Sequence, residues 1–511
     1  MINRVWRVVA LVALMGPLLA GCPDRAARFD DSIGLIGPHL VQGRAVYLSR
    51  GRRAALILEP STGSFTVAPL SSPPQNGQPV PGQPELAVLL SDAEVLEVID
   101  TEQGGVTTFE LGSAFDALSL SSDGGFALTS FAGGAAGVLS NAAEVAVVDL
   151  DAAPSDTNPT RRTVASAGGT PIGIDVSPPF GATGRRIALV RSINHLAALD
   201  LTQPTGATRS IPLVSPGSDA TVVPQQIEFS VAGEILNVFI RVSGLNDVYH
   251  LRFDGNADVD GAPLPLLNQF AAGSAPSDIA VWPGESLSLL IVNAGSQDLT
   301  IINVQSAQAA TVALDTPVDS ILLYDGASGR EALIYAAGGV SAQFHRVALG
   351  DLAVKKSKAV ETRSLVSAIG EVEAVAGGAW FLVTHVGGNA AVTLVEGAGN
   401  RVMPFTGGGT VQDVAVAEDG STIWVLSNQA GIPRLGVIDV ASGHPESMDL
   451  NVGKTVSGLH RLADSDFLLV TRTDSLGALT LVRTSDVEAG LSTDITGFGL
   501  SGLLDEEDAD K

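Results

Sequence analysis

The sequence predicts an all-β protein, a β-propeller of four-stranded antiparallel blades in a single ring of about eight. Three observations lead to this prediction. A unit of three apolar, strand-like runs followed by a more polar run recurs along most of the chain. The copies are spaced by about 41 to about 52 residues, the period of a propeller blade. The composition is 45% hydrophobic and only 16% charged, as expected where neighbouring sheets cover both faces of most blades.

The clearest copy of the unit lies at residues 411–450. Val411 to Ala417 is a short apolar run, an Asp-Gly pair then favours a tight turn, and Ser421 to Leu426 is a second run rich in β-branched and aromatic residues. A third run, Arg434 to Val440, ends at another turn signal. A more polar run completes the unit, so each copy predicts a four-stranded meander.

Weaker copies are found at residues 115–150 and 276–314. In each copy a polar residue that follows two apolar ones marks the expected end of the third strand. The residues that fit this position well are Asp100, Asp149, Asp200, Asn303 and Asp439, and the looser fits are Glu59, Arg252, Arg346, Glu396 and Arg483.

The unit resembles the YVTN-type, lactonase-like β-propeller repeat. In that repeat an Asp-Val-Ala-Val strand, an Asp-Gly hairpin, an aromatic-Val strand and an Ile-Asp-x-x-x-Gly turn follow one another, and residues 411–450 contain all four. The resemblance is fair at residues 115–150 and 276–314 and faint elsewhere. It implies a fold. Because these motifs are structural, they bring no catalytic residue with them.

Residues 1–21 are expected to be a lipoprotein signal peptide. Arg4 and Arg7 precede an apolar run, Val8 to Leu19, that is too short to cross a bilayer. The following Leu-Ala-Gly-Cys sequence, ending at Cys22, resembles the bacterial lipobox. Cys22 is the only cysteine of the chain, so it can form no internal disulfide, and lipidation is the simplest reason for its presence. The alternative is an incidental cysteine behind an ordinary signal peptide.

Residues 22–33 are expected to be a short lipidated tether. Two or three acyl chains on Cys22 would anchor the protein stably to a membrane. By resemblance to enterobacterial sorting rules, the absence of aspartate directly after Cys22 favours the outer membrane over the inner one. The predicted location is therefore the bacterial cell envelope, with the membrane as a partner through the lipid.

Residues 34–499 are predicted to form the propeller. A proline-rich stretch at residues 71–84 suits a surface loop or a boundary, because proline is excluded from the interior of a sheet. Residues 115–499 hold about eight units, and the strands before them bring the tally close to ten. Since rings usually have four to eight blades, we expect one ring of about eight, with early strands at an edge or sealing the ring. Two smaller rings are the alternative.

The charge of the chain disfavours two classes of partner. The formal net charge is −26, it becomes more negative when the signal peptide is removed, and residues 500–511 form an acidic tail that should be disordered. Such a field repels nucleic acid and anionic lipid headgroups. A protein or a glycan is the expected partner.

One loop has the spacing of a cation site. Oxygen-bearing side chains occur at every second position, at Asp254, Asn256, Asp258 and Asp260, and resemble the Asp-x-Asp-x-Asp-Gly calcium loops of some extracellular propellers. No glutamate follows at the position of a bidentate ligand. The alternative is a polar turn without Ca²⁺, and no other cofactor is expected.

No catalytic residue can be assigned from the sequence. The Gly-x-Ser-x-Gly and His-Glu-x-x-His patterns are absent, and the seven histidines are scattered. We therefore expect a non-catalytic binding or scaffolding module anchored in the cell envelope. The alternatives are a lactonase-type propeller hydrolase with its site at the central channel, or an outer-membrane assembly factor, although the regular tryptophan-docked repeats of that factor are missing.

Overall fold

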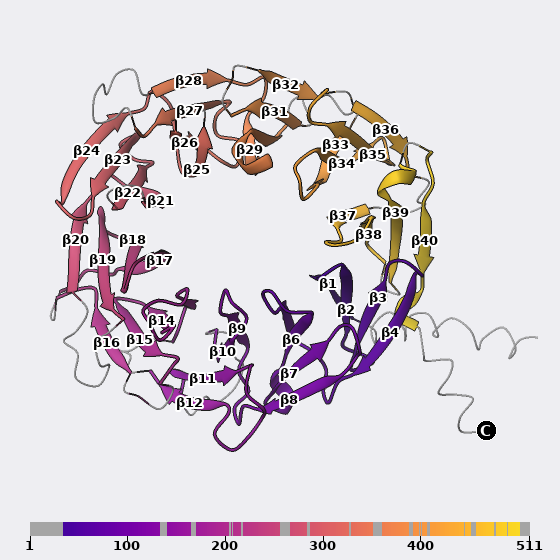
Figure 1. Ribbon diagram of the computed structural model, residues 1–511, viewed down its shortest axis with the longest axis horizontal. Helices are drawn as coiled ribbons and strands as arrows, with labels where there is room; N and C mark the ends of the chain where they lie inside the picture. The colour runs from indigo at the N-terminus through magenta and orange to yellow at the C-terminus, as the bar shows by residue number, and fades with distance from the viewer. Residues whose placement is uncertain are drawn as a thin grey trace, which may run out of the picture.

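The structure is a computed structural model in which forty strands form a closed ring of ten sheets (Figure 1). It describes residues 34–500 except 133–140, 165–169, 204–205, 207, 216–217, 256–265, 284–286, 327–328, 351–359, 388–391, 398, 400, 406–408, 444, 451–455, 475–476 and 488. Every sheet contains four strands consecutive in sequence and paired antiparallel. We number these blades 1 to 10 in chain order, so that blade 1 is β1–β4 and blade 10 is β37–β40.

Each blade begins at the middle of the ring and ends at its outer rim (Figure 1). The innermost strands are β1 (Leu35–Val41), β5 (Asn76–Pro79), β9 (Ala117–Leu120), β13 (Gly173–Val176), β17 (Val223–Ala232), β21 (Pro276–Pro283), β25 (Ser320–Gly326), β29 (Ile369–Val375), β33 (Thr410–Val416) and β37 (Val456–Arg461). The second strands are β2 (Arg44–Ser49), β6 (Glu85–Leu90), β10 (Phe126–Ser130), β14 (Ile187–Ser192), β18 (Ile235–Ser243), β22 (Leu287–Asn293), β26 (Gly329–Tyr335), β30 (Trp380–His385), β34 (Thr422–Gln429) and β38 (Phe467–Arg472).

The outer half of each blade completes the meander. The third strands are β3 (Ala54–Glu59), β7 (Val95–Asp100), β11 (Glu144–Asp149), β15 (His195–Asp200), β19 (Asp247–Asp254), β23 (Asp298–Asn303), β27 (Gln343–Ala348), β31 (Val392–Glu396), β35 (Ile432–Asp439) and β39 (Ala478–Arg483). The fourth strands are β4 (Ser64–Pro69), β8 (Val106–Glu110), β12 (Thr160–Thr163), β16 (Arg209–Pro212), β20 (Leu266–Ala271), β24 (Gln308–Ala313), β28 (Val360–Ser364), β32 (Val402–Phe405), β36 (Pro445–Asp449) and β40 (Thr493–Thr496). Short 3₁₀ turns are η1 (Ser91–Ala93), η2 (Ala376–Gly378), η3 (Thr484–Asp486) and η4 (Phe498–Leu500).

The prediction of four-stranded antiparallel blades is confirmed, but the predicted number of about eight is wrong. The early strands do not seal the ring. They form two complete blades, β1–β4 and β5–β8. Strand β5, Asn76–Pro79, lies inside the proline-rich stretch. It is the innermost strand of its sheet and pairs only with β6, and an edge position of this kind tolerates proline.

Strand ends follow the polar residues that mark them in the sequence. Strands β7, β11, β15, β23 and β35 end at Asp100, Asp149, Asp200, Asn303 and Asp439. These side chains accept hydrogen bonds from backbone amides two or three residues further on, for example Asp100 from Glu102 at 2.8 Å. A short polar side chain thereby closes the turn into the fourth strand. Among the looser fits, Glu59, Glu396 and Arg483 also end third strands, whereas Arg252 and Arg346 fall inside them.

The hydrophobic core is divided among the ten blade interfaces. Ten clusters of buried residues occur, and each joins one pair of neighbouring blades. Blade 4 packs on blade 5 through Leu189, Leu196 and Tyr249, for instance. Burial of apolar area is the main favourable contribution to folding. The ring is therefore held together by one such contact at every junction.

The ring closes by side-chain packing between blades 10 and 1. Tyr47 and Leu56 of blade 1 meet Leu469 and Leu479 of blade 10 in one buried cluster. Phe498, which follows the last strand, inserts between them and stacks on Phe65, with ring centroids 4.6 Å apart. In Figure 1 the yellow end of the chain lies beside the indigo beginning. We call this junction the seam.

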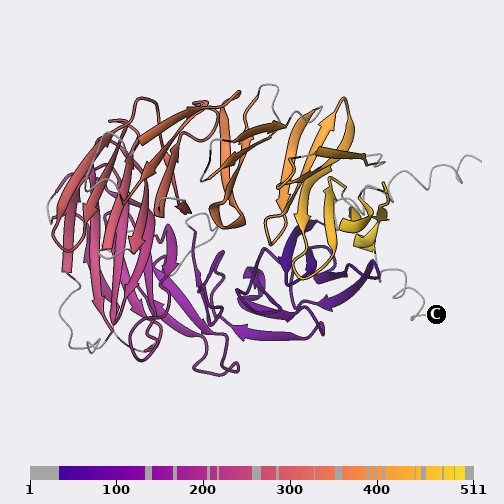
Figure 2. The ribbon, with the colours of Figure 1, turned by 45° about the horizontal axis from the view of Figure 1, so that its top comes forward.

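The ring has two faces, because the strands of each blade alternate in direction (Figure 2). Turns from a first to a second strand and from a third to a fourth strand lie on one side, which we call the hairpin face. Turns from a second to a third strand, and the segments that lead to the next blade, lie on the opposite side, the connector face. No helix among the described residues has the length and apolar character needed to cross a bilayer.

Candidate functional site: a trough across the seam

Two adjoining cavities lie on the hairpin face where blades 9, 10 and 1 meet. The larger has a volume of about 1120 Å³ and is lined by blades 9 and 10. The smaller has a volume of about 580 Å³ and is lined by blades 10 and 1. Ser465, Asp466 and Ser485 line both, and we call the two cavities together the trough. It crosses the seam, so it depends on the closed ring.

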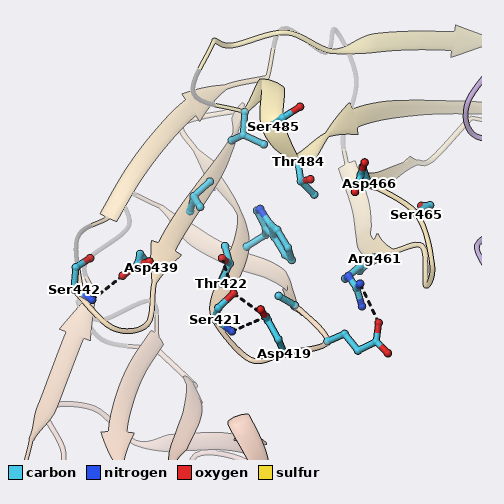
Figure 3. A pocket seen from close by; sticks show the side chains of 15 residues that line it. Asp419, Ser421, Thr422, Asp439, Ser442, Arg461, Ser465, Asp466, Thr484 and Ser485 are labelled. Carbon is cyan, nitrogen blue, oxygen red and sulfur yellow. Dashed lines mark hydrogen bonds and ion pairs between the residues drawn. The ribbon is translucent and has the colours of Figure 1, made fainter.

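Tight turns build the rim of the trough (Figure 3). Asp419 accepts hydrogen bonds from the amide of Ser421 at 2.9 Å and from its Oγ at 2.7 Å. Asp439 accepts one from the amide of Ser442 at 2.6 Å. Aspartate stabilises such turns through these bonds to its own backbone. The same residues that fold the hairpins therefore place carboxylates at the rim.

The charge state of Asp419 follows from this geometry. The hydrogen bond from the Ser421 amide, followed by that from the Ser421 hydroxyl, lowers the pKa of the Asp419 carboxyl below its ordinary value of 3.8. Hydrogen bonds to an ionised carboxylate favour the charged form. Asp419 is thus negatively charged at neutral pH.

The floor of the trough is apolar and mostly covered. The side chain of Trp424 on β34 is only 5% exposed and packs with Leu435 and Leu468 in the core between blades 9 and 10. Ala417, Val437 and Val487 also belong to the apolar lining of the larger cavity. Trp424 therefore contributes mainly to packing, and the walls above it are polar.

Negative charge is in excess in the trough. Six carboxylates and three guanidinium groups line it, and they are Glu59, Glu418, Asp419, Asp439, Asp464, Asp466, Arg44, Arg461 and Arg483. Arg461 pairs with Glu418 at 3.3 Å and Arg44 with Glu59 at 3.5 Å. Within the described part of the chain, no ion pair involves Asp419, Asp464 or Asp466. Asp419 accepts hydrogen bonds from Ser421 and lies in the field of Arg461.

The aspartate of the Asp-Val-Ala-Val motif has a structural role near the middle of the ring. One oxygen of Asp413 accepts a hydrogen bond from the amide of its neighbour Val414 at 2.9 Å, and the other accepts from Leu459 of the next blade at 2.8 Å. Asp278 makes the same bridge to Ile321 of the following blade, at 2.9 Å. The motif thus ties adjacent first strands together.

Other acids of the first strands influence one another. Burial, with the nearby carboxylates of Asp278 and Asp175, raises the pKa of Glu228. Burial and the adjacent Glu371 raise the pKa of Glu373 in the same way. Over the residues that are described, no three His, Cys, Asp or Glu side chains converge as they would around a metal ion.

Most of the predicted site residues lie outside the described residues. These are Cys22 and three members of the proposed calcium loop, Asn256, Asp258 and Asp260. Asp254, the fourth, ends β19, and its carbonyl oxygen accepts a hydrogen bond from Arg185 at 2.9 Å. Lipidation and calcium binding therefore stay predictions.

The histidines of the third strands are built into the blades. His195, His250 and His345 are at most 4% exposed. His345 contacts the hydroxyls of Thr316 and Thr362, at 2.7 and 2.9 Å. Burial, followed by the charge of Arg252, lowers the pKa of His250 to about 4. These side chains are neutral at pH 7 and belong to the framework.

Comparison with known proteins does not assign this chain to a family. No protein-family model matches the chain, and no curated protein matches its sequence. Among solved structures, dihydro-heme d1 dehydrogenase NirN in complex with DHE is similar, with 11% identity over 83% of this chain and 79% of that chain and a TM-score of 0.40. A eukaryotic initiation factor is similar with 12% identity over 89% of this chain and 96% of that chain and a TM-score of 0.48. The propeller is established by the ten blades themselves, and these similarities say nothing about what this chain binds.

Sequence reasoning did not find the trough. Its lining comes from residues 42–61 and 417–487, which are far apart in the chain and meet only when the ring closes. The available signals were the Asp-Gly turn at Asp419 and the aspartate at the end of a third strand, Asp439. Both were interpreted as turn signals, which they also are.

Proposed function

We propose that this chain is a lipid-anchored protein of the bacterial cell envelope, and that its propeller is a non-catalytic module whose trough binds a basic segment of a protein partner. The observation that carries the proposal is the excess of carboxylates in the trough, three of which have no ion-pair partner among the described residues. A lysine- or arginine-rich segment supplies the complementary charge. The anchor rests on the lipobox-like sequence at Cys22.

Electrostatics support a cationic ligand. The net charge of −26 attracts cations from a distance, and the carboxylates at the rim then fix where they bind. Asp419 remains ionised well into the acid range because its pKa is lowered. Asp464 and Asp466 form no ion pair among the described residues, so a positively charged ligand can bind them without breaking one.

The size of the trough favours a peptide over a small ion. The larger cavity alone, at about 1120 Å³, reaches the upper end of ordinary ligand pockets, roughly 300–1,000 Å³. Hydroxyl groups also line its walls, and they are Ser61, Ser421, Thr422, Ser442, Ser465, Thr484 and Ser485. An extended backbone can form hydrogen bonds with such groups along its length.

The proposal is tested with a fluorescein-labelled lysine oligomer and the full-length protein. Fluorescence anisotropy should show binding that weakens as salt is added. Asp419→Asn, Asp464→Asn and Asp466→Asn combined should weaken it by about tenfold, because exposed ion pairs contribute roughly 0.2–1 kcal/mol each.

Asp156→Asn is the matched control. Asp156 is exposed on the hairpin face of blade 3, outside the trough, so this variant loses charge without altering the site. Unchanged binding in the triple variant, or an equal loss per charge removed in the control, would show that the oligomer responds only to overall charge. Binding of a neutral oligosaccharide in its place would assign the trough to a glycan.

A further inference from the structure

The exposed apolar side chains are unequally divided between the two faces of the ring. Six large ones on the connector face are between 46% and 71% exposed, and they are Ile172, Ile193, Val340, Val366, Val386 and Ile432. On the hairpin face the described residues of this kind are Val231 and Leu491. The other three, Val67, Leu267 and Val402, lie on fourth strands at the outer rim.

Three of the six form a patch on blades 7 and 8. The amide of Gly339 donates to the carbonyl of Ile369 at 2.8 Å, which joins the turn containing Val340 to the segment containing Val366. A Cβ atom on Gly339 would lie 2.8 Å from the Cβ of Val386. Val340, Val366 and Val386 thus project from neighbouring turns. Exposed aliphatic groups gathered in this way indicate a contact surface.

The remaining three lie on two other blades. Ile172 and Ile193 belong to blade 4, and Ile432 belongs to blade 9. In Figure 1 blade 4 lies apart from blades 7, 8 and 9, which follow one another around the circle. Because all six side chains lie on or directly beside turns of the same face, they can meet one flat surface together. A peptide or a small ligand would reach only one sector.

The chain also enters the ring at this face. Gly34 precedes β1, and its carbonyl accepts a hydrogen bond from the amide of Arg50 in the turn between β2 and β3 at 3.2 Å. The described part of the chain therefore begins on the connector face, twelve residues after Cys22 in the sequence. The same turn holds Arg52 and Arg53, and Arg50 and Arg53 are exposed. Guanidinium groups form paired hydrogen bonds with phosphate oxygens.

We propose that the connector face rests on a phospholipid bilayer, with the six aliphatic side chains at the interface, the arginine turn near lipid phosphates and the trough directed away from the membrane. The inference rests on the proposed anchor at Cys22. Once the acyl chains hold the ring at the surface, the local concentration of lipid is high and shallow contacts suffice to orient it. Since the chain is acidic, a zwitterionic bilayer suits it better than an anionic one.

Single-cysteine probes can test the orientation in the full-length mature protein. Cys22 is the only native cysteine, and its thiol is consumed by lipidation, so an introduced cysteine can be labelled alone. Val366→Cys and Val386→Cys probe the connector face, and Asp156→Cys probes the hairpin face. Each variant is labelled with a nitrobenzoxadiazole dye and bound to phosphatidylcholine vesicles that contain spin-labelled lipid.

We expect strong quenching at residues 366 and 386 and none at residue 156. Combining Val340→Asp with Val386→Asp should reduce quenching of the dye at position 366, whereas Val231→Asp with Leu491→Asp on the hairpin face should not. Vesicle flotation is measured on the same samples. Flotation without quenching at residue 366, or with equal quenching on both faces, overturns the orientation and leaves the anchor intact. Loss of flotation overturns the anchor and the orientation with it.

Discussion

The two faces of the ring differ in why their residues are there. Many polar side chains of the hairpin face have a task in folding, as Asp100 and Asp439 do when they close the turns after third strands. The exposed aliphatic side chains of the connector face, such as Val366 at 71% exposure, stabilise no turn and fill no core. The acidic side chains of the hairpin face are explained in part by the turns they stabilise. The exposed aliphatic side chains of the connector face are not explained by folding, and we interpret them as a contact surface for another body.

The acids of the trough differ in the same way, since some stabilise a turn and others do not. Asp419 and Asp439 are explained in part by their turns. Asp464 and Asp466 form no side-chain hydrogen bond or ion pair within the described region, although both line the trough. Because folding does not explain their positions, they are better indicators of a ligand than Asp419 and Asp439. By the same reasoning, Val366 indicates a contact surface.

The largest effect is expected on membrane association when the proposed anchor at Cys22 is removed, because the proposed contact of the connector face with the membrane rests on that anchor. Cys22→Ser removes the thiol that accepts the lipid, so labelling by a palmitate analogue should be lost and the protein should leave the membrane fraction. Metabolic labelling followed by membrane fractionation measures both. Labelling that persists in the variant would contradict the proposed anchor, and the connector face would then need a different partner.

The next largest effect is expected on the free energy of unfolding when the seam is altered. The seam runs from one face of the ring to the other. Phe498 packs at the connector-face end, is 3% exposed and lies 4.8 Å from Tyr47 between ring centroids. Phe498→Ala should lower the free energy of unfolding by about 3–5 kcal/mol, the usual result of emptying a buried phenylalanine site. Urea unfolding followed by circular dichroism measures it.

Phe467, at the hairpin-face end of the same seam, is the matched comparison. It is partly exposed and packs beneath Arg483, whose guanidinium carbon lies 5.2 Å from the ring centroid. Phe467→Ala should be clearly less destabilising. Equal losses in the two variants would show that the seam is held evenly from both faces and that Phe498 is not its main closure.

The sequence predicted the repeating parts of this molecule better than the parts that occur once. Local signals suffice for a blade, because apolar runs and the turn residues Asp100, Asp149 and Asp439 act within a few positions of the chain. The number of blades was predicted wrongly because rings usually have four to eight blades, although the strand-like runs themselves brought the tally close to ten.

The trough and the two faces could not be predicted for a different reason. Residues Arg44 and Asp466 line the same cavity but belong to the first and last blades, and their proximity depends on closure of the ring by ten blades. Similarly, nothing local distinguishes Val366 from a core valine. Its exposure becomes visible only when the turn is placed on a face.

Acid should weaken the blades between the two faces through their buried histidines. Burial lowers the pKa of His250 to about 4, against an ordinary value of 6.5. Between these values the unfolded chain binds a proton that the native blade excludes. The free energy of unfolding should therefore fall as the pH drops from about 6.5 towards 4, and this contribution is constant above that range.

His250→Gln tests this assignment while keeping a donor for Asn237, which lies 3.0 Å from the imidazole. Thermal melting between pH 7 and pH 4 should show a shallower decline in the variant than in the native chain. His39, His195, His345 and His460 also have lowered pKa values, so part of the decline should remain. An unchanged slope would exclude His250 as a source of acid sensitivity.

The smallest effect is expected in a comparison of two aspartates on first strands, one that joins two blades and one that is exposed on the hairpin face. Asp278 joins blade 6 to blade 7 through the amide of Ile321 at 2.9 Å, whereas Asp325 on the hairpin face pairs with Arg330 while its side chain is 78% exposed. Asp278→Ala leaves a partly buried amide unsatisfied and should lower the free energy of unfolding by about 1–3 kcal/mol. Asp325→Ala should change it by less than about 1 kcal/mol, because exposed ion pairs contribute little. Urea unfolding of both variants measures the difference. Similar values would mean that the bridge between blades made by Asp278 is no more structural than an exposed ion pair on the hairpin face, and the distinction between folding acids and ligand-binding acids would then have to be abandoned.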